Sequence, residues 1–475
     1  MRFFLIVGVG LLGLILPLNI CGQSEITPPT SDSEMLTPSK FNDILLRYHP
    51  MAKRADLVQQ QGSAKVQKAR GSFDPKLSYY RVQKSGLKIP TWFGIDLKLY
   101  KEQNRGANLN PEHNVPSDGL YGVGIELPIG KGLFTDQRRT ALNKAKVMRD
   151  VQMNKRHQLL MKLLNQGFQD YWKWASLYQR KQLISETVSA AEQRFKDVKT
   201  AFRGGERTAI DTIEALSQLQ QFKVRKRSLR GQYQQQKAKL SGYLWDDKQQ
   251  PRRMTNEVKP PQITNFNLET LKGLANEARN MDSVSNQHPA LAQYRNKLEL
   301  LSLENRLKKE QFKPKLDLKY HALQNAGNAT SLAEQQVDDD LKWGFNFQFP
   351  IFLRKERGAL KVNELKQRNT ELKFEQKQLA LQRRLEGSAA RLEQLYQQIK
   401  TNKANLANFE RLLEAEQRLY RAGESSLLKV NLRELKYLEA QLKHVKYTSQ
   451  FFQAYSKLRY RYMYQRSLAE TANAE

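Results

Sequence analysis

Two long stretches of the chain repeat their apolar residues at the spacing of a coiled-coil helix. Residues 136–202 and residues 355–420 contain no proline. The apolar series are Ile184, Val188, Ala191, Phe195, Val198 and Phe202 in the first stretch, and Leu385, Leu392, Ile399, Leu406, Leu413 and Tyr420 in the second. Residues at this spacing form a seam that faces a partner helix. The pattern therefore predicts two helices of roughly 100 Å each, at 1.5 Å per residue.

Other stretches alternate apolar and polar residues, which is typical of strands with one apolar face. The strand-like runs are Leu77–Val82, Ile95–Tyr100, Tyr121–Leu127, Leu316–His321 and Trp343–Phe349. The last run places four aromatic residues on one face and small or polar residues on the other. Such alternation suits the wall of a membrane β-barrel, although a strand of a soluble sandwich shows the same pattern.

The second half of the chain repeats the landmarks of the first. Phe73-Asp74-Pro75-Lys76-Leu77 matches Phe312-Lys313-Pro314-Lys315-Leu316, and His49-Pro50 matches His288-Pro289. Each half reads helix, strand, loop, strand, long helix, glycine turn and returning helix, with loops expected at 106–118 and 325–340. Matched landmarks in order indicate a structural repeat. Each repeat is expected to supply two main strands, so that the chain supplies four.

These landmarks divide the chain into six segments. They are a signal peptide (1–22), a flexible leader (23–40), a first repeat (41–245), a connector (246–286), a second repeat (287–465) and a C-terminal tail (466–475). The signal peptide rests on Met1-Arg2 followed by an apolar run to Ile20. A retained membrane anchor is its alternative. Leu18-Asn19-Ile20-Cys21 also resembles a lipoprotein box, which makes Cys21 a candidate for lipidation. The chain shows no second long apolar run, so any membrane crossing by the mature chain is expected to use a closed barrel.

Composition narrows the function classes. The net charge is +31, but the charges are spread along the helical stretches, and a secretory signal argues against a nucleic-acid partner. One cysteine excludes a disulfide framework. The chain has no P-loop, no His-Glu-x-x-His and no Gly-x-Ser-x-Gly, so we expect no enzyme, no cofactor and no metal site. His49 and His288 precede prolines at helix starts and are expected to cap or pack rather than bind metal.

With these features the chain resembles the TolC-like outer-membrane efflux family over about residues 41–464. The resemblance rests on the two-fold repeat, the Pro75 and Pro314 junctions, the strand ends at Pro128-Ile129 and Pro350-Ile351, and the glycine turns. It implies a mainly α fold with a membrane β-barrel, in which a homotrimer shares twelve strands in outer-membrane lipid and extends an α-helical tunnel of coiled-coil hairpins across the periplasm. It also implies an export duct that docks to a periplasmic adaptor protein and an inner-membrane transporter.

The resemblance also implies where the partners and the entrance lie. The adaptor would contact the two helix–turn–helix tips, formed by Phe202, Arg203, Gly204, Gly205 and Glu206 and by Tyr420, Arg421, Gly423, Glu424 and Ser425. Family members often carry carboxylates just inside the second tip. Here Lys429 stands at that place and Asp211 at the matching place in the first repeat. These two are the candidate entrance-lining residues, and an acidic, cation-binding gate is in doubt.

Two readings compete with the export duct. A secreted coiled-coil scaffold would use the same helices without a barrel, and solubility of the mature chain without detergent would favour it. A basic nucleic-acid-binding protein is opposed by the signal peptide. The trimer follows from a separate argument: four strands are too few to close a membrane barrel, so several copies must share one.

Overall fold

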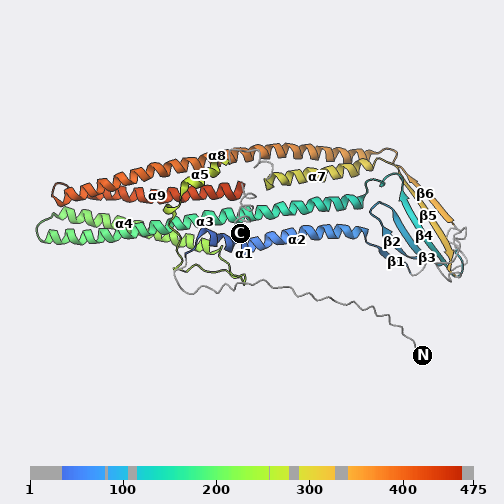
Figure 1. The fold of residues 1–475 in the computed structure, drawn as a ribbon, viewed down its shortest axis with the longest axis horizontal. Helices are drawn as coiled ribbons and strands as arrows, with labels where there is room; N and C mark the ends of the chain where they lie inside the picture. The colour runs from blue at the N-terminus through green and yellow to red at the C-terminus, as the bar shows by residue number, and fades with distance from the viewer. Residues whose placement is uncertain are drawn as a thin grey trace, which may run out of the picture.

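The computed structural model is an elongated rod, with a β-sheet at one end and two helical turns at the other (Figure 1). It describes residues 35–80, 84–104, 115–255, 257–277, 288–326 and 341–462. The predicted signal peptide, Cys21, most of the leader and the C-terminal tail lie outside these residues. The two loops expected at 106–118 and 325–340 lie largely outside them as well.

Two very long helices run the length of the rod, as predicted. Helix α3 (Gln137–Arg203) is capped by Asp136, whose side chain accepts the Arg139 amide, and helix α8 (Arg354–Arg421) is its counterpart in the second half. Each is followed by a returning helix, α4 (Ala209–Ser241) after α3 and α9 (Leu427–Tyr462) after α8. Each long helix packs along its returning helix (Figure 1).

The predicted apolar seams face these partner helices. Leu385, Leu392 and Ile399 are buried, and Ile184 and Val188 are buried on α3. Burial decreases toward the turns, where Phe202 is exposed. The coiled-coil prediction is therefore confirmed over most of each seam.

Shorter helices complete the sheet-side half of the rod. They are α1 (Pro38–Arg47), α2 (Pro50–Arg70), the 3₁₀ turn η1 (Gly71–Phe73) and α7 (Pro289–Glu310). The repeat predicts a single helix before the first strand, but the structure has two, α1 and α2, because the chain breaks at His49. The reason is local, because the residue before a proline is pushed to extended geometry. His49 Nδ1 accepts the Met51 amide at 3.0 Å, and His288 Nδ1 accepts the Ala290 amide at 3.1 Å, so both histidines cap helices.

The main hydrophobic core surrounds the middle of α3. Trp174 and Tyr171 are fully buried there, and the Tyr171 hydroxyl donates to the Leu36 carbonyl at 2.6 Å. Phe41 stacks on Tyr171, with 5.1 Å between ring centroids. Gly167 lets α1 approach closely, because a Cβ at this position would lie 2.8 Å from Leu45 Cδ1. The leader was expected to extend to residue 40, but the chain is packed from about residue 35.

The connector between the repeats wraps over this core. It contains the 3₁₀ turn η3 (Ile263–Asn265) and helix α5 (Leu268–Glu277), and α5 packs against α8 and α9. Ile263 is fully buried in the core. The connector therefore joins the first hairpin to the second through apolar contacts as well as through the chain.

The sheet contains six antiparallel strands in sequence order, whereas five strand-like runs were predicted and four main strands were counted. They are β1 (Lys76–Tyr80), β2 (Lys84–Pro90), β3 (Asp96–Glu102), β4 (Leu120–Pro128), β5 (Lys315–Asn325) and β6 (Leu341–Gln348). Strands β4 and β5 join the two repeats, with Ile125 opposite Tyr320. Strand β1 corresponds to the predicted run Leu77–Val82, whereas β2, which forms a hairpin with β1, was not predicted. Gly86 and Pro90 interrupt the alternation of β2, which becomes a strand by pairing with β1 and β3.

Candidate functional site

The sheet exposes its apolar face. The pairing aligns Leu77, Leu87, Leu99, Val123 and Ala322 across five strands on one side. The next aligned row ends at Trp343 on β6, which is 76% exposed. Other exposed members of this face are Tyr79, Tyr121, Ile125, Leu318, Tyr320, Leu341, Phe345 and Phe347. A continuous apolar surface of this kind marks contact with another protein or with lipid.

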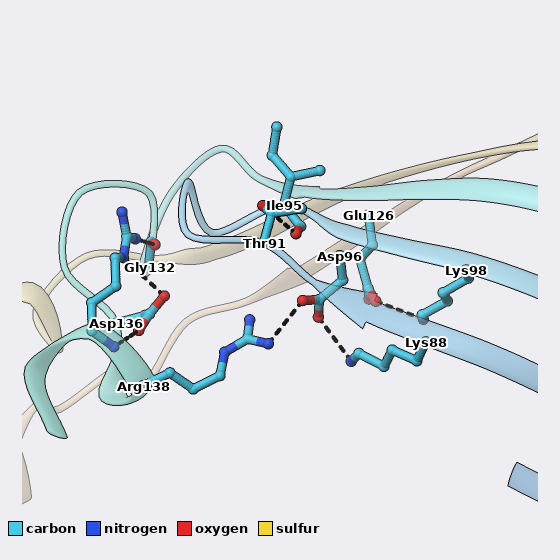
Figure 2. Close-up of polar contacts among 10 residues, drawn as sticks. Lys88, Thr91, Ile95, Asp96, Lys98, Glu126, Gly132, Asp136 and Arg138 are labelled. Carbon is cyan, nitrogen blue, oxygen red and sulfur yellow. Dashed lines mark hydrogen bonds and ion pairs between the residues drawn. The ribbon is translucent and has the colours of Figure 1, made fainter. Parts of the chain in front are cut away.

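The opposite face of the sheet carries paired charges and is partly covered. Asp96 is only 9% exposed and lies between Lys88 Nζ at 2.8 Å and Arg138 Nη1 at 2.9 Å (Figure 2). Glu126 faces Lys98 at 2.6 Å on the neighbouring strand (Figure 2). The polarity is thus reversed relative to a sheet of a water-soluble protein, in which the apolar face would be covered.

Aromatic side chains gather where the strands meet the helices. Trp92 and Phe93 lie in the turn between β2 and β3, and Trp92 stacks on Phe73 with 4.4 Å between ring centroids. Phe134 and Phe352 occupy the two strand-to-helix connections and are exposed. Aromatic residues at the edge of an apolar band are typical of membrane–water interfaces.

The two turns at the far end of the rod share one geometry. Gly205 and Gly423 have φ of +80° and +79°, a conformation that favours glycine. In the first turn the Glu206 amide donates to the Ala201 carbonyl, and in the second the Glu424 amide donates to the Leu419 carbonyl, both at 2.9 Å. The residues predicted for the tips thus lie together at this end, and a Cβ at Gly205 or Gly423 would have no atom within 4 Å.

The tips contact each other within one chain. The Arg207 guanidinium lies over the Tyr420 ring, 4.4 Å from its centroid. Val198, Ala215 and Leu427 form a small buried cluster below the turns. The two hairpins are therefore held together close to their ends.

A partly buried ion pair strengthens this contact. Arg194 on α3 donates two hydrogen bonds to Glu434 on α9, at 2.5 and 2.7 Å. Gln218 on α4 donates to the same carboxylate at 3.2 Å, and Asn431 lies 3.3 Å from Arg194. Burial opposes the charge on Arg194, but the hydrogen bonds and the charge of Glu434 outweigh it and raise the pKa of the guanidinium.

An apolar groove lies beside this ion pair, between α4 and α9. It has a volume of about 540 Å³. Ile210, Ile213, Leu428 and Leu432 line it and are exposed. Sequence reasoning missed this groove and the Arg194–Glu434 pair. The signal in the sequence is the pair Ile210 and Ile213, two apolar residues at helical spacing near the start of the returning helix.

The two candidate entrance residues differ in their surroundings. Asp211 accepts the Thr208 amide at 3.0 Å and the Thr208 hydroxyl at 2.9 Å, so it forms a capping box at the start of α4. Lys429 is exposed on the first turn of α9. Ser425 in the second tip donates to Glu416 at 2.5 Å, which ties that turn to α8.

Two further properties of the described residues bear on other functions. No group of three or more His, Cys, Asp or Glu side chains in the described part of the chain is arranged to hold a metal ion. Among the described helices, none combines the length and the apolar composition needed to cross a membrane.

Comparison with known proteins shows which proteins share this architecture. Residues 281–460 match the sequence model of the outer membrane efflux protein family. No curated protein matches the sequence. The fold resembles the CmeC outer membrane channel of Campylobacter jejuni, with a TM-score of 0.61 and 14% identity over 89% of this chain and 85% of that one.

Two further structures resemble the chain to a similar degree. A membrane protein from Pseudomonas aeruginosa gives a TM-score of 0.64 and 16% identity over 89% of this chain and 91% of that one. The open state of the MtrE outer membrane channel of Neisseria gonorrhoeae gives 0.60 and 14% over 89% and 87%.

The fold is that of solved outer-membrane channels, and the sequence match over residues 281–460 points to the same class of protein. The chain is thus similar to the outer membrane efflux protein family, whose model matches less than half of its residues. The prediction of this family and of a mainly α fold with a strand sheet is thus confirmed, and the soluble scaffold leaves the apolar sheet face unexplained.

Proposed function

We propose that the protein is one subunit of a passive export duct in the outer membrane, without catalytic chemistry of its own. The sheet forms part of the wall in lipid, and the helices form a tunnel that reaches toward a periplasmic adaptor and an inner-membrane transporter. The observation that carries this proposal is the exposed apolar face of the sheet. Lipid covers such a face without cost, whereas water does not.

The same sheet supports a homotrimer. Its two edge strands, β1 and β6, have no partner on their outer sides among the described residues. Backbone groups left unpaired in lipid cost several kcal/mol each. Six strands are fewer than the eight of the smallest membrane barrels, so one chain does not close a wall by itself. Three copies sharing one wall satisfy both requirements.

The tips and the groove beside them are the proposed adaptor contact. An amphipathic helix or helical hairpin docks by placing apolar side chains in such a groove. Ile213 and Leu428 face the groove from α4 and α9, and Glu214 adds one charge at its wall. The exposed tip residues, including Arg203, Glu206 and Arg421, would frame the groove with polar contacts.

The entrance is proposed to lack a ring of free carboxylates. Asp211 is engaged by Thr208 in the capping box, and Lys429 is exposed where family members often carry an acid. A cation would therefore meet a basic group at this position of α9. Calcium or other cations are not expected to block transport at this level.

A pair of neighbouring substitutions tests the membrane face. Phe345→Lys places a charge on the apolar face, at a cost of about 2–4 kcal/mol if the position lies near the bilayer centre. Asn346→Lys makes the same change on the opposite face. We expect Phe345→Lys to reduce the protein recovered in outer-membrane fractions while Asn346→Lys does not. Equal recovery of both variants would contradict the lipid-facing assignment.

A second pair tests the docking groove. Ile213 lines the groove and is 67% exposed, whereas Val224 on the same helix lies outside it and is 66% exposed. Ile213→Asp should reduce cross-linking to the adaptor and export of the transported compound, and Val224→Asp should leave both unchanged. Loss of cross-linking in both variants, or in neither, would contradict docking in the groove.

A further inference from the structure

The β1–β2 hairpin occupies the side of β3 that would otherwise be the edge of the sheet. All seven residues of β3 pair with β2, from Asp96 opposite Pro90 to Glu102 opposite Lys84. Glu102 also pairs with Leu120 at the start of β4. The hairpin therefore reaches the same height as the neighbouring strands. Because β3 has strands on both sides, its backbone is not available to another chain.

The hairpin also continues both faces of the sheet. Leu77 on β1 and Leu87 on β2 extend the apolar row that contains Leu99. Lys76 and Lys88 extend the polar row that contains Lys98 on β3. A hairpin that belonged to a soluble loop would not need this register, since a shift by one residue would exchange its faces.

The base of the hairpin is fixed to the helices. Lys88 and Arg138 share the Asp96 carboxylate, which joins β2, β3 and α3 (Figure 2). Trp92 in the following turn stacks on Phe73 at the end of η1, with an interplanar angle of 8°. Removing the hairpin from the sheet would break these contacts together with the ladder between β2 and β3.

We propose that the β1–β2 hairpin is part of the channel wall and that β1 pairs with β6 of a neighbouring copy. This inference rests on the proposed homotrimer. β1 and β6 lie at opposite edges of the sheet (Figure 1). With an even number of alternating strands, β6 of one copy runs antiparallel to β1 of the next. Each chain thus contributes six strands, and the shared wall contains eighteen rather than twelve.

The strand number changes the width of the duct. The diameter of a barrel grows roughly linearly with its number of strands. An eighteen-strand wall is therefore about one and a half times as wide as a twelve-strand wall. The exit in the membrane would admit bulkier cargo than four strands per chain would allow.

Cysteine cross-linking distinguishes a boundary between copies formed by β1 and β6 from one formed by β3 and β6. Lys76 on β1 and Lys98 on β3 lie in one row and on the same face, two strands apart. Each is replaced by cysteine, in a Cys21→Ser background, and combined in turn with cysteine at Lys342, Gly344 or Asn346 on β6. A disulfide needs Cα atoms within about 7 Å. In the eighteen-strand wall, β3 is three strand spacings from β6 of the neighbour, or about 14 Å.

We expect Lys76→Cys to give covalently linked trimers with at least one β6 partner in outer-membrane preparations, and Lys98→Cys to give none. Links from Lys98→Cys would overturn the proposal, because they require β3 to lie next to β6 of the neighbouring copy. Absence of links from both series in a complex with the mass of a trimer would also overturn it. A detergent-solubilised complex of another mass would instead overturn the shared wall on which the inference rests.

Discussion

The Arg194–Glu434 pair is expected to control how firmly the two hairpins hold together near the tips. The Arg194 side chain is 20% exposed and that of Glu434 is 11% exposed. Replacing Glu434 with leucine leaves a mostly buried guanidinium without its carboxylate, and Arg194→Leu leaves the carboxylate without its cation. Breaking a buried pair in this way costs about 3–5 kcal/mol.

The double variant should behave differently from either single variant. When both partners become leucine, no charge remains buried, and such replacements are often neutral or stabilising. The loss in the single variants should therefore be largely recovered, and the double variant should lose far less than the sum of the two single losses.

Hydrogen exchange of the first turns of α9 is the suitable assay, because opening near the tips is local and does not require unfolding of the rod. A loss of about 3 kcal/mol corresponds to roughly a hundredfold faster exchange of amides that open with the pair, since about 1.4 kcal/mol is tenfold. Peptides from residues 427–440 should show the change, while peptides from the sheet-proximal part of α8 should not.

The control is the exposed ion pair between Glu192 on α3 and Lys223 on α4, which have 2.9 Å between charged atoms. Solvent-exposed pairs contribute little, so Glu192→Leu should leave the exchange of residues 427–440 near that of the unaltered protein. Unaltered exchange in Glu434→Leu, or a double variant whose loss equals the sum of the two single losses, would refute the reasoning.

Three further outcomes are expected. Gly205→Val and Gly423→Val should strain the turns by about 1–3 kcal/mol each. Both should lower adaptor cross-linking and leave outer-membrane recovery unchanged, and Gly204→Ala, at a position with negative φ, is the control. Burial lowers the pKa of His49 below its ordinary value of 6.5, so the stabilisation that His49 contributes should be complete above pH 6.5 and should decrease as the pH falls through the lowered pKa. His49→Asn keeps a capping acceptor but does not titrate, so thermal unfolding of this variant in detergent should depend less on pH. Gly167→Leu should destabilise the core by about 1–3 kcal/mol through overpacking against α1, and an unchanged midpoint of thermal unfolding would contradict that packing.

Local patterns in the sequence determined the helical half of this protein. The long helices, their seams and both turns were predicted because apolar periodicity and the positions of glycine and proline act within a few residues of the chain. The caps at His49 and His288 belong to the same class, since each histidine needs only the amide two residues later. The pairing of Thr208 with Asp211 is also local, although its role as a capping box was recognised only in the structure.

Tertiary structure decided the features that join distant segments. Arg194 and Glu434 are far apart in the sequence, and neither stands out in its own helix until α3 and α9 are packed together. The groove exists only between α4 and α9, because Ile213 and Leu428 come from different hairpins. Strand β2 is the strongest case: its own residues include Gly86 and Pro90, which oppose a strand, and it becomes one because β3 offers a complete row of backbone partners.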